Sequence, residues 1–237
     1  MFQNIKKSWE DFFSLKMIAL NLLPIIIGIA FWSFILFYFG NQILTTLEHI
    51  LPTSWKNLLE NPGFFASIGG FFIKTFLYLL LAFFVIILTI IGNIFISIFY
   101  TPIVIGYLRK KYYPDIFIHS FGGIKTSIFH FLKSLLWLIL FVAILSPLFF
   151  IPVVGVFAVL IPHFFFFKNT MLFDVGSSIF NESEYHSFLS KNRVKIYQIS
   201  LIAYIFSLIP FFNFFATLLQ TIIISRFVLD KKEQQNL

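Results

Sequence analysis

The chain has 237 residues, of which 59% are hydrophobic and only 11% are charged. Phenylalanine alone occurs 37 times, and the mean hydropathy is +0.93. A single water-soluble domain of this length has too little interior to hide that much apolar surface, and a disordered chain is far more polar. Composition therefore excludes a soluble enzyme and predicts a chain that is solvated by lipid.

Charge and cysteine content further limit the kinds of site and partner that the protein can have. There are no cysteines, which excludes disulfides, thiolate metal sites and thiol catalysis. The formal charge is +7, from 17 Lys+Arg against 10 Asp+Glu. Membrane proteins concentrate Lys and Arg in cytoplasmic loops, so this excess does not require a nucleic-acid partner. We expect the lipid bilayer as partner and no nucleic acid.

The N-terminal region predicts two elements. Residues 1–16 place apolar and charged side chains on different sides of a helix, which predicts an amphipathic interfacial segment with Trp9 at headgroup depth. Residues 17–39 form an apolar run too long for a signal peptide. At about 35 Å, this run is long enough to be a retained transmembrane helix.

A loop with Gly and Pro turn signals is expected from Gly40 to residue 70, with a short surface helix in its middle. Residues 71–100 are then almost continuously apolar, interrupted by Lys74 and by Gly92-Asn93. They predict a second long transmembrane helix of about 45 Å, which must tilt or project beyond the bilayer. Arg109, Lys110 and Lys111 follow as a topology anchor at lipid headgroups, or alternatively as an anion vestibule.

The second half contains two apolar stretches that prolines interrupt, within residues 134–167 and 196–229. Each is either one long broken helix or a hairpin of two shorter helices. Basic residues flank both ends of both stretches, and the positive-inside rule then places all four ends in the cytoplasm. An even number of passes follows, and the N- and C-termini are expected in the cytoplasm.

Arms of about 13–19 residues are short for a full crossing. The two turns carry no charge, so we expect the hairpin tips to lie within or barely through the bilayer. The polar stretch 177–192, with Glu182 and Glu184, is interpreted as a solvated loop. The predicted fold is all-α integral membrane: two long transmembrane helices plus two proline-broken helical hairpins that partly or fully insert, in a single polytopic domain, 1–237.

Four segments resemble motifs of one membrane family in order and spacing: residues 92–103, 150–155, 171–174 and 209–214. They are similar to the CysZ family of bacterial sulfate permeases, which shares a domain with the etoposide-induced membrane proteins. The resemblance implies a bacterial inner-membrane location, homo-oligomers and sulfate uptake. The family typically carries a Gly-hydrophobic-Arg-Arg motif before its first transmembrane helix. Here a single Lys16 stands near that position, and lysine lacks the bidentate fork of arginine.

The hairpin turns suggest where an anion passes. In each hairpin the second arm begins just after Pro152 or Pro210, so its free N–H groups and partial positive charge point into the membrane. We expect Gly155 and Asn213 to line an anion route together with Lys16 as tentative substrate-binding residues. The alternative is that both turns are simply tight and packed.

Catalysis finds no support in the sequence. Zinc-binding His pairs, a nucleophile elbow and nucleotide-binding glycine loops are absent, so no catalytic residues, metal or cofactor are expected. The leading function is an anion permease or channel, with sulfate as substrate. The alternative is a structural or lipid-associating membrane protein of the same domain class, and an intramembrane enzyme is the weakest reading.

Overall fold

The computed structural model describes residues 2–60, 68–81, 85, 100–151, 153–209 and 212–236. Every regular element in these ranges is helical, and they contain no strand. Three helical stretches are long and apolar enough to cross a membrane: Leu15–Leu47, Lys125–Phe150 and Val154–Ile179. The predicted all-α membrane fold is confirmed, and the chain is a multi-pass membrane protein.

The chain divides into two compact units, which are described separately. One unit consists of Ala19–Ile96, and the other joins Met1–Ile18 to Ser97–Leu237. The second unit therefore brings the first residues of the chain together with its last 140 or so. The site described below lies wholly within this second unit.

The unit Ala19–Ile96 contains most of α2 (Leu15–Ile50), then α3 (Thr53–Glu60) and the helix Ile68–Leu81. Helix α2 continues past Gly40, where a loop was expected. Thr45 and Thr46 donate their hydroxyls to the carbonyls of Asn41 and Gln42, so these polar side chains are satisfied inside the helix.

The predicted transmembrane helix 71–100 is only partly described. Its first part lies in the helix Ile68–Leu81, where Ile73, Leu77 and Leu81 are buried. Most of the remainder, including Gly92-Asn93, lies outside the described residues.

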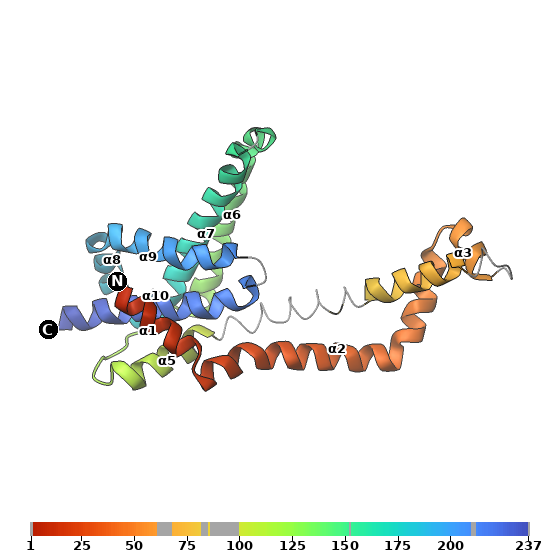
Figure 1. The fold of residues 1–237 in the computed structure, drawn as a ribbon. Helices are drawn as coiled ribbons and strands as arrows, with labels where there is room; N and C mark the ends of the chain where they lie inside the picture. The colour runs from red at the N-terminus through yellow and green to blue at the C-terminus, as the bar shows by residue number, and fades with distance from the viewer. Residues whose placement is uncertain are drawn as a thin grey trace. The chain divides into compact units, whose positions relative to one another are not determined.

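Helix α10 (Asn213–Asn236) forms the core of the second unit (Figure 1). It packs against α1 (Phe2–Phe12), α5 (Tyr100–Tyr112), α7 (Val154–Ile179) and α9 (Arg193–Ile205). Residues 218–229 of α10 are all buried. A helix that other helices surround on all sides has apolar residues on every face. The apolar stretch of α10, which was predicted to be a membrane-inserted arm, is therefore largely surrounded by other helices of the protein.

The first hairpin consists of α6 (Ile124–Leu145), the 3₁₀ turn η1 (Ser146–Phe150) and α7. The expected range of 134–167 with short arms is wrong. The arms contain 22 and 26 residues, about 33 and 39 Å, and either is long enough to cross a bilayer. Lys133 and Lys168 therefore lie inside these helices, as the tenth residue of α6 and the fifteenth of α7. A long cationic side chain can run along an apolar helix surface and keep its ammonium group in water.

The second hairpin consists of α9, a short 3₁₀ turn η2 (Phe206–Leu208) and α10. Helix α9 has 13 residues, about 20 Å, which is less than the thickness of the hydrocarbon core. Pro210, which was expected to break this hairpin, lies outside the described residues.

A further helix, α8 (Glu182–Lys191), joins the two hairpins where a solvated loop was expected. It begins with a capping box: the Asn181 side chain accepts from the Glu184 N–H at 2.9 Å, and the Glu184 carboxylate accepts from the Asn181 N–H at 2.9 Å. These two bonds satisfy N–H groups that the helix cannot satisfy itself.

Candidate functional site

Helix α1 is held to the protein by a polar stripe. Asn4, Ser8 and Asp11 recur at spacings of four and three residues, which places them on one face of the helix. Ser8 and Asp11 are completely buried. Tertiary partners on α5 and α10 cover Asp11, so this charged side chain is shielded from solvent.

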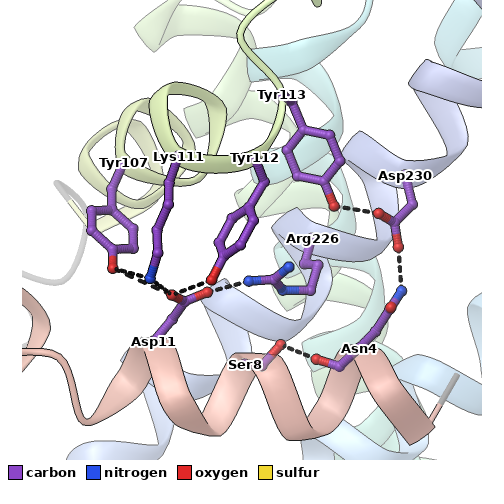
Figure 2. A network of polar contacts seen from close by, with 9 residues as sticks. All are labelled: Asn4, Ser8, Asp11, Tyr107, Lys111, Tyr112, Tyr113, Arg226 and Asp230. Carbon is purple, nitrogen blue, oxygen red and sulfur yellow. Dashed lines mark hydrogen bonds and ion pairs between the residues drawn. The ribbon is translucent and has the colours of Figure 1, made fainter.

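Asp11 is the centre of a cluster of donors from two other helices, α5 and α10 (Figure 2). Its Oδ1 accepts from Lys111 Nζ at 2.8 Å, from Tyr112 Oη at 3.1 Å and from Tyr107 Oη at 3.3 Å. Its Oδ2 accepts from Nη2 of Arg226. The buried carboxylate is thus both charge-paired and hydrogen-bonded on each oxygen, as a buried charge requires.

The cluster carries more positive than negative charge. Lys111 and Arg226 both pair with Asp11, so one carboxylate faces two cations. The Lys111 side chain is 45% exposed, whereas Arg226 is 2% exposed. Hydrogen bonds to Asp11, Tyr107 and Tyr112 raise the pKa of Lys111 above its ordinary value and keep it protonated. The Arg226 guanidinium also lies 4.3 Å from the Tyr112 ring centre, a cation–π distance.

A second carboxylate continues the network along α10. Asp230 accepts from the Tyr113 hydroxyl and from the Asn4 side-chain amide (Figure 2). Burial raises the pKa of Tyr113, and the neighbouring Asp230 carboxylate raises it further, so the phenol stays neutral and can donate. The start of α1 and the end of α5 are therefore both tied to one turn of α10.

Lys16, one of the predicted substrate-binding residues, lies beside this cluster. It is exposed in the first turn of α2, and its Nζ lies 5.5 Å from the centre of the Tyr107 ring. Lys111 Nζ lies 5.3 Å from the centre of the same ring. Tyr107 is thus flanked by two cations from different helices.

A comparison with family models matches residues 4–217 to one family, Sulfate transporter CysZ/Etoposide-induced protein 2.4. The match covers most of the chain. The protein belongs to this family. The resemblance seen in the sequence motifs is confirmed. No curated protein and no solved structure matches the chain significantly.

The family-like motif at residues 171–174 contains Asp174, whose side chain is hydrogen-bonded to another helix. Thr101 Oγ1 of α5 donates to Asp174 Oδ2 of α7. Thr101 is 2% exposed, so this bond satisfies polar groups at a closely packed helix crossing. It ties α5, which contributes Tyr107 and Lys111 to the cluster, to the first hairpin.

Gly155 lies at the start of α7, where it packs tightly against the preceding turn. A Cβ at this position would lie 2.8 Å from Phe149 O and 3.0 Å from Phe149 Cα. The Gly155 N–H donates to Ile151 O at 2.8 Å, so it is satisfied within the turn. Close backbone approach explains why glycine is needed here.

Asn213 is the first residue of α10. Its side chain and Pro210 lie outside the described parts of the chain. The structure brings Lys16 to the charged cluster, but it does not describe Lys16, Gly155 and Asn213 as one site. No group of three or more possible metal ligands gathers within the described ranges.

A second buried cation on α10 was also missed by sequence reasoning. Lys232 Nζ donates to the Ile179 carbonyl and to the Glu184 carboxylate, each at 3.0 Å. Its side chain is 3% exposed. Lys232 therefore caps the C-terminal end of α7, where a cation is favoured by the helix dipole. The Asn-x-x-Glu pattern at residues 181–184 was a signal that could have revealed this helix junction.

Proposed function

We propose that the protein is an inner-membrane permease or channel that takes up sulfate or a related tetrahedral oxyanion. Membership of the CysZ/etoposide-induced protein 2.4 family carries the proposal. Three helices able to cross a bilayer support a transport role. The basic excess of the chain is consistent with a route for a dianion.

Lys16 is the residue proposed to meet the anion first. It stands in the first turn of α2, where the positive end of the helix dipole favours negative charge. Lys111, which also lies near the Tyr107 ring, adds a second positive charge nearby. Asp11 holds Lys111 by an ion pair, so the two lysines differ: Lys16 is free to move toward an anion and Lys111 is positioned.

Gly155 and Asn213 complete the proposed route. Gly155 supports it by allowing the tight turn that starts α7 inside the membrane. Asn213 is proposed to donate its side-chain amide at the start of α10. Both positions lie at the start of a helix that follows a turn, where the positive end of the helix dipole favours an anion.

The membrane arrangement is part of the same proposal. Both chain termini are placed in the cytoplasm, and the protein is proposed to form homo-oligomers in a bacterial inner membrane. The large exposed apolar surface of α6, where the spanning stretch is only 6% buried within the chain, supports contact with lipid or with another copy.

The test is uptake of radiolabelled sulfate into vesicles that contain the purified protein. We expect sulfate-dependent flux, reduced severalfold in Lys16→Gln and unchanged in Lys7→Gln, which removes an exposed lysine from α1. Asn213→Leu with unchanged flux would remove Asn213 from the route. Absence of flux from correctly folded protein would instead favour a structural or lipid-associating role.

A further inference from the structure

A cavity of about 690 Å³ opens at the base of the first hairpin. Its walls come from the first turns of α6, the last turns of α7, and the helices α8 and α9. Two cations, Lys168 and Arg193, line it together with the imidazoles of His130 and His186, against one carboxylate, Glu182. Neither Lys168 nor Arg193 forms an ion pair within the described parts of the chain.

Aromatic rings fix the position of two of these basic groups. Lys168 Nζ lies 4.0 Å from the centre of the Tyr197 ring. The His130 ring stacks on Phe173 at 3.9 Å with an angle of 5° between the planes. Cation–π and stacking contacts hold these groups at the cavity wall without neutralising Lys168, so its positive charge remains available to an anion.

An apolar groove between α6 and α7 lies next to the cavity. A second hollow of about 310 Å³ is lined by Trp137, Phe141, Pro162 and Phe165, among others. Asn169 lines both hollows, so they are neighbours that share this residue in their walls. On α6 the lining residues pass from His130 to Phe141, which is about 16 Å along the helix axis toward the hairpin tip.

We propose that this composite site binds an anionic phospholipid, with the phosphate in the basic cavity and an acyl chain in the α6–α7 groove. Charge complementarity selects the anionic headgroup, because basic residues near a membrane surface attract acidic lipids. The groove follows two helices that are apolar enough to span the bilayer. A lipid with its phosphate in the cavity and its acyl chain in the groove would therefore point in the same direction as the lipids of the surrounding leaflet.

A free oxyanion is the rival occupant of the basic cavity. It shares the phosphate chemistry but leaves the apolar groove unfilled. The placement of a basic hollow directly beside an apolar one favours an amphiphile over a free ion. The inference does not rest on the proposed permease function, since a transporter and a structural protein can both hold such a lipid.

The first measurement uses the unmodified chain in detergent and in vesicles. We expect phosphatidylglycerol to raise the unfolding temperature more than phosphatidylcholine with the same acyl chains. Lipids brominated on their chains report the groove, because bromine quenches the fluorescence of a nearby Trp137. Brominated phosphatidylglycerol, diluted into phosphatidylcholine, should quench the Trp137 component more than brominated phosphatidylcholine does. Trp137→Phe identifies that component.

Variants then test the basic cavity. Lys168→Gln with Arg193→Gln should weaken the phosphatidylglycerol effect by about tenfold in apparent affinity, since two cations are lost. The matched control, Lys133→Gln with Lys191→Gln, removes two exposed lysines that do not line the cavity and should behave like the original chain. Both double variants are first compared in phosphatidylcholine, where equal unfolding temperatures show that folding is intact.

Two results would overturn the proposal. One is equal quenching and equal stabilisation by the two lipids in the unmodified chain. The other is stabilisation by soluble glycerol phosphate or sodium sulfate as large as that by phosphatidylglycerol, which would make the cavity a site for free anions. Sulfate flux is measured separately, so failure of the lipid site and failure of transport are distinguishable.

Discussion

Asp11 and Arg226 lie 215 positions apart in the chain, yet their side chains pair in a site closed to solvent. The pair joins the N-terminal helix to the central helix of the same unit. Buried ion pairs add little net stability compared with apolar packing, but they strongly disfavour any arrangement in which one charge is left alone. We infer that this pair fixes where α1 docks, and with it the position of Lys16 just beyond.

Replacement of Asp11 therefore has a large expected effect. Asp11→Asn leaves Arg226 buried without its counter-charge and should lower the free energy of unfolding by about 3–5 kcal/mol. Glu10→Gln, which removes an exposed neighbouring carboxylate, is the control and should be nearly neutral. Unfolding of the detergent-solubilised protein, followed by helix content, measures both.

The double variant Asp11→Leu with Arg226→Met separates charge pairing from packing. It should recover much of the stability that Asp11→Asn loses, because no charge is left buried without a partner. If the double variant were as unstable as the single one, shape at this contact would matter more than charge.

The sequence predicted the helical membrane fold because hydropathy and proline positions are local signals. The spanning helix near the N-terminus and the turn that contains Pro147 follow from such signals. The partners of Asp11 were not predictable in this way, since Tyr107, Lys111 and Arg226 come from distant segments.

The partners of the basic residues of α10 were likewise not predictable from the sequence. Arg226 and Lys232 fit the positive-inside rule, which treats a cation as a marker of one side of the membrane. In the structure both are buried and each has a carboxylate partner. Composition predicts that such residues avoid the lipid, but the contacts that replace water depend on how the helices pack.

Gly155 offers a test of the hairpin turn. In Gly155→Ala the new Cβ would meet backbone atoms of Phe149 at 2.8 and 3.0 Å, and backbone cannot move aside as a side chain can. We expect a loss of about 1–3 kcal/mol in the free energy of unfolding. Gly106→Ala in α5 is the control, because its Cβ would have nothing within 4 Å and alanine is the better helix former. Equal effects of the two substitutions would contradict the tight turn.

Val153 is strained next to that turn. Its φ is 68°, a region that β-branched residues rarely adopt. It is also 69% exposed, so its side chain contributes little packing. Val153→Gly should leave stability unchanged or raise it by up to about 1 kcal/mol, since relief of strain offsets the added flexibility of glycine. Val154→Gly, one residue into α7, should instead lower the unfolding temperature.

Glu184 should make stability depend on pH at the junction of α7, α8 and α10. Burial raises its pKa, but the Asn181 N–H and the Lys232 ammonium outweigh burial, and the pKa is lowered from its ordinary 4.5. A lowered carboxyl pKa contributes stability that is present above 4.5 and is lost as pH falls through the native value. Because Glu184 is partly exposed, we expect an effect of about 1 kcal/mol or less.

The Glu184 contribution is measured as the difference in unfolding temperature between the original chain and Glu184→Gln across pH. The difference should be largest near about pH 7 and should shrink as pH falls below 4.5 and the carboxylate of the original chain takes up its proton. Glu182→Gln is the matched control, since Glu182 is exposed and lies outside the capping box. A difference that grows as pH falls would have the wrong sign for a carboxylate held by Lys232, and the ion pair would then not be what stabilises this junction.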